Sequence, residues 1–493
     1  MPNVKAYFEK LFSAHGIEIP SKREKMFQNF IENEENRTKI KTILELQNTI
    51  MKNWKLDTRI RDIIEQQIQI PNGTVGKKYE TKLDFIKLGL DDIIYSDFIG
   101  LEEYGLKYDN ESEIINGTPI KNGDFKVKLN FRISGEEEDS ILNEKTFNLI
   151  INADPKSLWK DIESNQEDPF WKADNVSEFQ SIGDKNIVVA SRRGRSHANV
   201  GSFRDDDYSF KHLEETGWSI VSVSDGAGSA KFSRKGSEIA CKEVIHYFEN
   251  KLTNELSLQF DTLVSDLNKE NNKVVLESEA KENEDNEVEN LADIKTETTK
   301  SKIGKFIYNN LGGCAKWVHN KLEEFANLNE TYIKDFHSTL IFTLFKKYDF
   351  GYVVLTFGVG DCPIGILNKD LTEFKLMNWL DVGEFGGGTR FITMPEIFTS
   401  DKFVTRFGFK IIDDFSYLML MTDGIYDAKF VVEANLEKLE KWKEFIADLK
   451  GENEDNAAVE FNVSNEEITN QLANWMDFWS PGNHDDRTLA IVF

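Results

Sequence analysis

The chain of 493 residues is long enough for two or three domains with ample hydrophobic core. Its formal net charge of −26 argues against a nucleic-acid backbone or an anionic membrane surface as the main partner, because both are bound by basic surfaces. The three cysteines are widely spaced, and the sequence carries no secretory or membrane-spanning pattern, which predicts a cytoplasmic protein in a reducing compartment.

The N-terminal region, residues 1–72, is predicted to be helical. Apolar side chains recur with helical spacing in Val4–Phe12 and again in Ile60–Ile64. The sequence Pro71-Asn72-Gly73 then reads as a turn that closes the region. These residues carry no catalytic pattern, so an interaction module or a packing extension is the expected role.

A small β domain, sandwich-like, is predicted over residues 75–155. Phe125–Ile133 alternates apolar and polar side chains, as a half-buried strand does, and Phe147–Ile151 follows as a second strand. This domain is expected to function in binding or as a spacer. Residues 156–182 are predicted to be a linker that packs at least in part.

The remainder, residues 183–493, is predicted to form one large unit of grouped helices and strands. A helix is expected from about Lys235 to Leu263 and another from about Ile303 to Asn327, and strands dominate from Phe336 to Leu420. The acidic, polar stretch at about 269–302 lacks aromatic residues and is predicted to be a disordered insertion. Elements grouped in this way favour an α+β layered architecture with mainly antiparallel sheets.

Several apolar strands in this unit deliver an acidic residue at one end. The buried strand before Asp225-Gly226 ends abruptly in an acid and a glycine, and Leu418–Gly424 and Val353–Asp361 have the same construction. Asp485-Asp486 precedes the last strand, and Asp205–Asp207 lies shortly upstream of Asp225. Each motif alone is a common turn, but their repetition favours a shared carboxylate site for hard cations.

The order of these motifs resembles the metal-dependent protein phosphatase family of the protein phosphatase 2C type, most closely its bacterial members. The matching stretches follow family order and span residues 194–488. They are Gly194–His197, Asp205-Asp206, Asp225–Lys231, Ser338-Thr339, Gly360-Asp361, Thr422–Asp427 and Asp485–Thr488. The first 180 residues lie outside the resemblance.

The resemblance implies a four-layer α-β-β-α sandwich with Mn²⁺ or Mg²⁺ at one end of its two sheets. Asp225 would bridge two ions, and Asp206 would orient water. The implied ligands of these two ions are Asp205, Asp225, the Gly226 carbonyl, Asp423 and Asp485, with Asp361 and Asp427 at a third ion found in some members. All are oxygen donors, which suit these cations, and a water bridging two of them is acidic enough to attack phosphorus.

Two groups expected of the family lack a clear counterpart. Many eukaryotic members have a histidine where Ala227 stands, and His197 and His484 are the nearby candidates for a catalytic histidine. The usual phosphate-gripping arginine is absent from its place, so Arg192, Arg193 and Arg195 are the candidates for phosphate binding.

The predicted function is a metal-dependent serine/threonine phosphatase that acts on phosphoproteins, with a serine/threonine kinase among the partners that family analogy suggests. Two alternatives stay open. The chain could be a catalytically weak family member that binds phosphoproteins as a regulator. It could also be a binding scaffold whose main function is carried by residues 1–155, with the phosphatase unit secondary.

Overall fold

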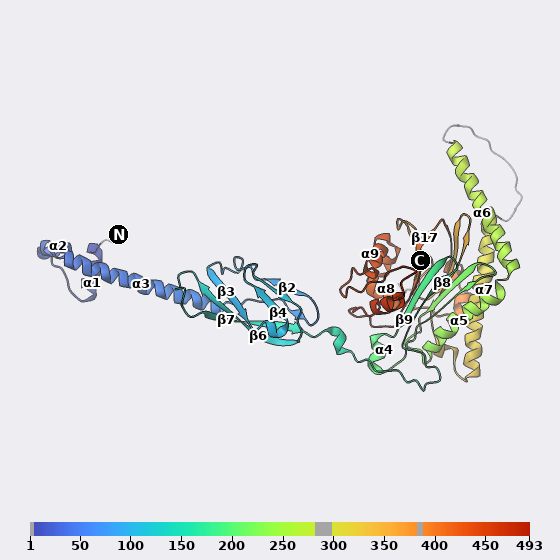
Figure 1. Ribbon diagram of the computed structural model, residues 1–493, viewed down its shortest axis with the longest axis horizontal. Helices are drawn as coiled ribbons and strands as arrows, with labels where there is room; N and C mark the ends of the chain where they lie inside the picture. The colour runs from blue at the N-terminus through green and yellow to red at the C-terminus, as the bar shows by residue number, and fades with distance from the viewer. Residues whose placement is uncertain (1–3, 282–297, 382–387) are drawn as a thin grey trace. The chain divides into compact units, whose positions relative to one another are not determined.

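The computed structural model describes residues 4–281, 298–381 and 388–493. It divides into two compact units, Met1–Leu158 and Trp159–Phe493 (Figure 1). Each unit has its own hydrophobic core. Among the described residues, every helix is too short or too polar to cross a membrane.

The helices of the first unit form a small bundle around aromatic side chains. Their bounds are α1 Val4–Ala14, η1 Ser21–Arg23, α2 Glu24–Glu32 and α3 Glu34–Glu65. Phe8, Phe27, Ile31 and Ile40 are buried together, as the helical spacing of apolar residues requires. The α3 helix begins at Asn33, whose side chain accepts a hydrogen bond from the backbone N–H of Asn36.

Two sheets in the first unit enclose a separate core. The strands are β1 Gly73–Thr74, β2 Tyr79–Lys82, β3 Ile93–Ile99, β4 Leu106–Asp109, β5 Ile114–Gly117, β6 Gly123–Ile133 and β7 Asn143–Asn152, with short helices η2 Glu102–Tyr104 and η3 Pro155–Leu158. One sheet has the order β1-β7-β6-β3 and the other β2-β5-β4. Val127 and Phe131 of one sheet are buried with Leu106 and Ile115 of the other, which gives a two-sheet packing.

The second unit is built on two antiparallel sheets. The first has the order β10-β11-β12-β13-β16 and the second β15-β14-β17-β18-β9-β8. Their strands are β8 Asn175–Ile182, β9 Lys185–Arg192, β10 Asp207–Leu213, β11 Trp218–Ser224, β12 Leu340–Tyr348, β13 Gly351–Val359, β14 Ile364–Asn368, β15 Phe374–Leu376, β16 Phe407–Ile412, β17 Phe415–Met421 and β18 Arg487–Val492. Val221 and Ile341 from the first sheet pack with Val189 and Leu418 from the second. The sheets therefore stack face to face.

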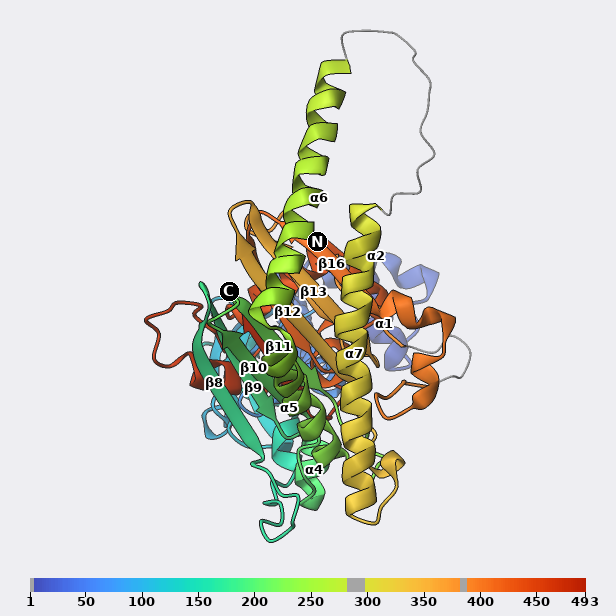
Figure 2. The same ribbon diagram turned by 90° about the vertical axis from the view of Figure 1, so that its right-hand side faces the viewer.

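Helices cover both outer faces of this sandwich. They are α4 Arg195–Val200, α5 Ser233–Lys251, α6 Asn254–Lys281, α7 Thr299–Leu328, α8 Asp423–Phe430, α9 Leu439–Leu449 and α10 Ile468–Trp475, with short helices η4 Ile333–Phe336, η5 Pro395–Phe398, η6 Asp401–Arg406 and η7 Glu433–Glu437. Figure 2 shows α5, α6 and α7 in front of the first sheet, where Val244 and Leu311 are buried against it. On the opposite face, Phe445 and Leu472 pack against the second sheet. The predicted four-layer α-β-β-α sandwich is thereby confirmed.

The prediction of one helix from Lys235 to Leu263 is wrong in one respect, because the structure has two helices there, α5 and α6. The chain leaves helical geometry at Leu252, whose ψ is 62°. Thr253 then starts α6, since its hydroxyl accepts a hydrogen bond from the backbone N–H of Leu256. The apolar spacing continues across the break, so periodicity could not detect it.

Two further expectations differ from the structure. The insertion predicted to be disordered at 269–302 is helical as far as Lys281 and again from Thr299, because Glu, Lys, Leu and Ala are strong helix formers even in an acidic stretch. Its remaining part, 282–297, lies outside the described residues. The expected linker 156–182 includes β8, which pairs antiparallel with β9 at the edge of the second sheet.

Candidate metal centre

The register of the first sheet brings Asp205, Asp206 and Asp225 to one end of the sandwich. The β10 and β11 strands are antiparallel, and Asp207 at the start of β10 pairs with Ser224 at the end of β11. The acids just before β10 therefore lie beside the acid just after β11. Asp225 is fixed further by Thr339, whose hydroxyl accepts a hydrogen bond from the Asp225 backbone N–H at 2.9 Å.

The second sheet contributes its acids at the same end. Met421 at the end of β17 pairs with Leu489 near the start of β18, so Asp423 and Asp485 leave the sheet at one edge. Asp361 follows β13 of the first sheet, and Asp427 lies one turn beyond Asp423 on α8. The charges of Asp423, Asp206, Asp361 and Asp485 all act on Asp225, and the charge of Asp427 acts on Asp423, so these acids lie close together.

Two glycines allow the acid-bearing segments to approach this closely. A Cβ atom on Gly226 would lie 2.6 Å from the carbonyl oxygen of Asp205, and one on Gly424 would lie 2.0 Å from the carbonyl oxygen of Asp486. Real side chains do not tolerate such contacts with backbone. The glycine after each strand-end acid is therefore a packing requirement of the cluster.

The clustered carboxylates repel one another. Burial, followed by the charges of Asp423 and Asp206, raises the pKa of Asp225 well above its ordinary value. Burial and then Asp485 do the same to the pKa of Asp423. Burial and the charge of Asp486 raise the pKa of Asp205 to about 6 and that of Asp206 to about 7. Such a cluster needs protons or cations to offset its charge.

Two oxygen atoms in the cluster are buried without a hydrogen-bond partner among the described residues. One is Oδ1 of Asp206, whose other oxygen accepts hydrogen bonds from the hydroxyls of Thr422 and Thr488, both at 2.8 Å. The second is Oδ1 of Asp361, whose Oδ2 accepts a hydrogen bond from Thr389 at 2.7 Å. Buried carboxylate oxygens are rarely left unpaired, so these atoms are available to a cation or its water. The donor set is all oxygen and fits Mg²⁺ or Mn²⁺.

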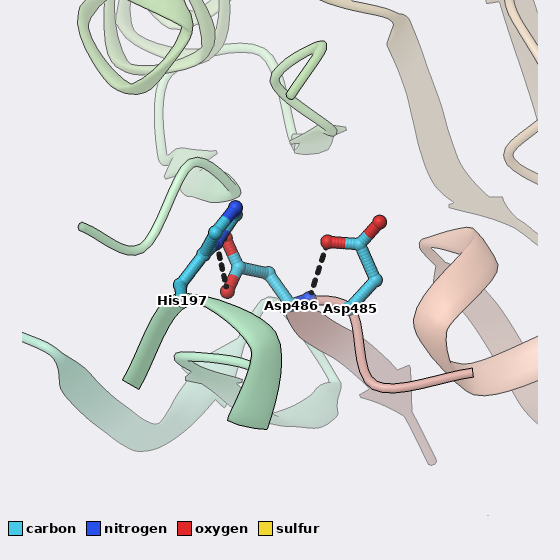
Figure 3. Close-up of side chains that lie close together, drawn as sticks. All are labelled: His197, Asp485 and Asp486. Carbon is cyan, nitrogen blue, oxygen red and sulfur yellow. Dashed lines mark hydrogen bonds and ion pairs between the residues drawn. The ribbon is translucent and has the colours of Figure 1, made fainter. Parts of the chain in front are cut away.

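His197 belongs to the edge of the same cluster (Figure 3). Its Nδ1 atom lies 3.1 Å from both carboxylate oxygens of Asp486, and its Nε2 atom lies 3.9 Å from Oδ2 of Asp205. Burial alone would lower the pKa of His197, but the hydrogen bond and charge of Asp486 outweigh it and raise the pKa to about 9. The imidazole is therefore cationic at neutral pH. Figure 3 also shows that the Asp485 carboxylate accepts a hydrogen bond from the Asp486 backbone N–H.

The other candidate side chains occupy different surroundings. Arg192 and Arg195 both pair with Asp477, at 3.0 and 2.5 Å. Arg193 is buried and pairs with acids of the segment that precedes β8. The ring of His484 lies between two tryptophan rings, 4.5 and 4.8 Å from their centroids. These contacts give each side chain a structural partner.

Three residues that hold the acids in place had been given no role from the sequence. Asp486 accepts hydrogen bonds from the backbone N–H groups of Gly194 and Asp205 as well as contacting His197. Lys172 donates to the Asp206 carbonyl at 2.7 Å and to Asp207 at 2.9 Å, and Arg204 donates to the same carbonyl. Asp486 carried a sequence signal through its place beside Asp485, whereas a single lysine in an expected linker carried none.

We expect Lys172→Met to weaken Mn²⁺ binding about tenfold, because groups that orient metal ligands typically control affinity at this level. Loss of the buried ion pair with Asp207 should also destabilise the second unit by about 3 kcal/mol. Titration calorimetry with Mn²⁺ and urea unfolding measure the two effects.

Lys185→Met is the matched control, because Lys185 forms a similar ion pair with Asp414. Lys185 lies at the start of β9, whereas the other end of β9 leads to Gly194 at the carboxylate cluster. This variant should destabilise the fold and leave Mn²⁺ affinity unchanged. Equal affinity losses in the two variants would contradict the role given to Lys172.

Comparison with known proteins places these features in a family. The family model for protein phosphatase 2C matches residues 193–477. A search of curated proteins found no match to this chain. The family match covers the whole first sheet and strands β14, β15 and β17 of the second, together with all of the clustered acids except Asp485 and Asp486, which follow it.

Solved structures similar to this chain include several phosphatases. Serine/threonine phosphatase Stp1 from Staphylococcus aureus is 13% identical, over 64% of this chain and 96% of that chain, with a TM-score of 0.33. The catalytic domain of the serine threonine protein phosphatase PstP, in complex with two manganese ions, is 11% identical, over 64% and 98%, with a TM-score of 0.33. A bacterial serine phosphatase is 13% identical, over 62% and 96%, with a TM-score of 0.31. Because these identities and scores are low, the family assignment rests on the family model.

Proposed function

The chain belongs to the protein phosphatase 2C family, and we propose that it is a metal-dependent protein serine/threonine phosphatase that hydrolyses phosphomonoesters. The observation that carries the proposal is the cluster of carboxylates at one end of the sandwich, with two buried oxygens that have no hydrogen-bond partner among the described residues. An unused cluster of this kind would only destabilise the fold. A divalent cation would offset the charges that make these carboxylates repel one another, and the same carboxylates would be its ligands.

Each acid has a distinct proposed role. Asp225, the Gly226 carbonyl, Asp423 and Asp485 would hold the first ion, and Asp225 together with Asp205 would hold the second. Asp206 is held by two threonine hydroxyls through one oxygen, which leaves the other free to orient water. The proposed ions are Mn²⁺ or Mg²⁺, with a third at Asp361 and Asp427.

When bound, the two ions acidify a water so that it can attack phosphorus, and they offset charge on the phosphoryl oxygens. The chain itself supplies the geometry. The two strand-end glycines bring Asp205 and Asp486 against the acid-bearing turns, so that carboxylates from both sheets meet without long side chains. Short, packed ligands hold a site more tightly than flexible ones.

His197 is the proposed proton donor to the leaving oxygen. Its pKa of about 9 keeps it protonated at neutral pH, and Asp486 fixes its Nδ1 side. That contact leaves Nε2 as the nitrogen that is available to a departing group. This role would fill the gap left by the alanine at position 227, where many eukaryotic members of the family have a histidine.

The proposed substrate is a protein phosphorylated on serine or threonine, and a serine/threonine kinase is one such partner. Residues 1–155 are proposed to bind or space partners, and the protein is proposed to act in the cytoplasm. A second candidate function, a weakly catalytic regulator that binds phosphoproteins, has one specific observation in its favour. All three candidate phosphate-binding arginines are paired with acids, Arg192 and Arg195 with Asp477 and Arg193 with Asp161 and Asp174.

Turnover of para-nitrophenyl phosphate and of a panel of phosphoserine and phosphothreonine peptides separates the two functions. We expect no turnover in EDTA, brisk turnover when Mn²⁺ or Mg²⁺ is added, and loss again on chelation, because the metal-free carboxylates offer no nucleophile. The full chain should be assayed. Binding of phosphopeptides without metal-dependent release of phosphate would favour the regulator and reject the phosphatase.

A further inference from the structure

A cavity of about 480 Å³ lies beside the metal centre, lined by the segment after β15 and by η5 and η6. Its wall carries three cationic side chains, Arg390, Lys402 and Arg406, and two acids, Asp381 and Glu396. The indole of Trp379 also lines it and is 55% exposed. An exposed tryptophan beside a charged hollow is typical of a surface that binds a partner.

Arg406, in the wall of the cavity, is paired with an acid. The residue is 5% exposed, and its guanidinium forms two hydrogen bonds with the two carboxylate oxygens of Asp381, at 2.5 and 2.9 Å. Its Nε atom is buried and has no hydrogen-bond partner among the described residues. The exposed cations of the wall, Arg390 and Lys402, are therefore the groups that an incoming anion can reach.

The remaining lining charges favour an anion. The pair formed by Arg406 and Asp381 is neutral overall, which leaves Arg390 and Lys402 against Glu396. Both cations are exposed, and neither side chain forms a hydrogen bond or ion pair with another described residue. A surface hollow with excess positive charge stands out on a chain of net charge −26, and it will attract negative groups.

Two short segments connect this cavity to the metal centre. Asp381 accepts a hydrogen bond from the backbone N–H of Gly360, the residue before Asp361, and donates its own backbone N–H to the Gly360 carbonyl. Thr389 donates its hydroxyl to Asp361 at 2.7 Å, and the next residue is Arg390. The cavity and the carboxylate cluster are thus joined through direct contacts of neighbouring residues, so two nearby groups of one peptide substrate would be able to occupy both.

We propose that this cavity binds an anionic side chain, a carboxylate or a second phosphate, that flanks the phosphorylated residue of a protein substrate. Lys402 and Arg390 bind the anion, and Trp379 packs on the peptide. The inference rests on the proposed phosphatase function and narrows its substrates to phosphosites in acidic or multiply phosphorylated sequences.

The test uses the full chain with Mn²⁺ and three phosphopeptides that differ only in the flanking residues, which are neutral, acidic or carry a second phosphoserine. The wild-type protein should show kcat/KM for the anionic peptides about tenfold above the neutral one, a size expected of two partly desolvated charge contacts. A larger gain for one anionic peptide identifies which source of negative charge the cavity prefers.

Lys402→Glu should abolish this preference or reverse it, mainly through KM. Lys316→Glu is the matched control, because Lys316 is an exposed lysine on α7, outside the cavity lining, and it should keep the full preference. Trp379→Ala should raise KM for all three peptides alike. The indole is largely exposed, so the fold tolerates its loss.

Turnover of para-nitrophenyl phosphate, which has no flanking residues, separates the two proposals. If the wild-type protein fails to hydrolyse this compound with any divalent ion, the phosphatase function itself is rejected. If it hydrolyses the compound but treats the three peptides alike, or if Lys402→Glu keeps the wild-type preference, the cavity is not an anion subsite and the inference is overturned.

Discussion

Asp225→Asn is expected to lower kcat/KM for every phosphorylated substrate on the order of 10³-fold, since metal-derived charge stabilisation is worth several kcal/mol. Asp225 is the residue on which the charges of Asp423, Asp206, Asp361 and Asp485 converge. A neutral amide cannot bridge two cations as a carboxylate does. Steady-state kinetics with saturating Mn²⁺ measures the loss.

The same substitution should leave the metal-free fold intact. The raised pKa of Asp225 means that the folded protein favours a protonated, neutral side chain there, and asparagine closely resembles that form. Unfolding should therefore show a midpoint at least as high as that of the wild type in EDTA. Asp349→Asn, in the exposed turn between β12 and β13, is the control and should change neither kcat/KM nor the unfolding midpoint. Activity retained in Asp225→Asn would reject the bridging role.

The sequence was sufficient to predict the parts of the site that follow from strand order. Each acid next to an apolar strand, such as Asp225 and Asp423, lies at a strand end, and antiparallel pairing carries such ends to the same edge of the sandwich. The glycines that follow these acids could also be identified in the sequence, but the structural reason for them could not. Only the packing reveals that a Cβ on Gly424 would collide with the carbonyl of Asp486.

What the sequence could not predict depends on contacts between distant segments. Lys172 lies in a stretch that resembled a linker, yet its ammonium group reaches across to the backbone of Asp206. Arg195 was a candidate for phosphate binding because the usual arginine of the family is absent from its place, and the sequence could not show that its guanidinium lies against Asp477. Side-chain partners of this kind are set by the fold and leave no periodic signal in the chain.

The second large effect is expected in the pH dependence of stability without metal. The unfolded acids titrate near pH 4, whereas the pKa is about 6 for Asp205 and about 7 for Asp206 in the folded state. The folded state then binds more protons than the unfolded state between these values, so stability falls as pH rises from about 5 to about 8. Asp205 alone accounts for about 1.4 kcal/mol of the loss between about pH 5 and 8, and for about 3 kcal/mol over the whole range that begins below about pH 4.

Asp486 and His197 also determine the pH range over which stability falls. The pKa of Asp486 is lowered, because the hydrogen bond and charge of His197 outweigh its burial, so its contribution to stability is already complete above about pH 5. His197, with a pKa of about 9, loses its stabilising charge as pH rises from about 6.5 through 9 and adds to the decline. The net slope between about pH 5 and 8 is therefore downward.

Urea unfolding in EDTA at about pH 5 and pH 8, followed by tryptophan fluorescence, measures this decline. Trp54 is the one tryptophan of the nine that lies within Met1–Leu158, so the signal reports mainly the unit that carries the site. Saturating Mn²⁺ should remove the part of the decline that comes from Asp205 and Asp206, because cations offset the charge of the ionised cluster. Mn²⁺ at 100 times its Kd also adds about 2.7 kcal/mol by mass action. Stability that rises between pH 5 and 8 without metal, or that ignores Mn²⁺ at pH 8, would mean that the acids neither repel one another nor hold a cation.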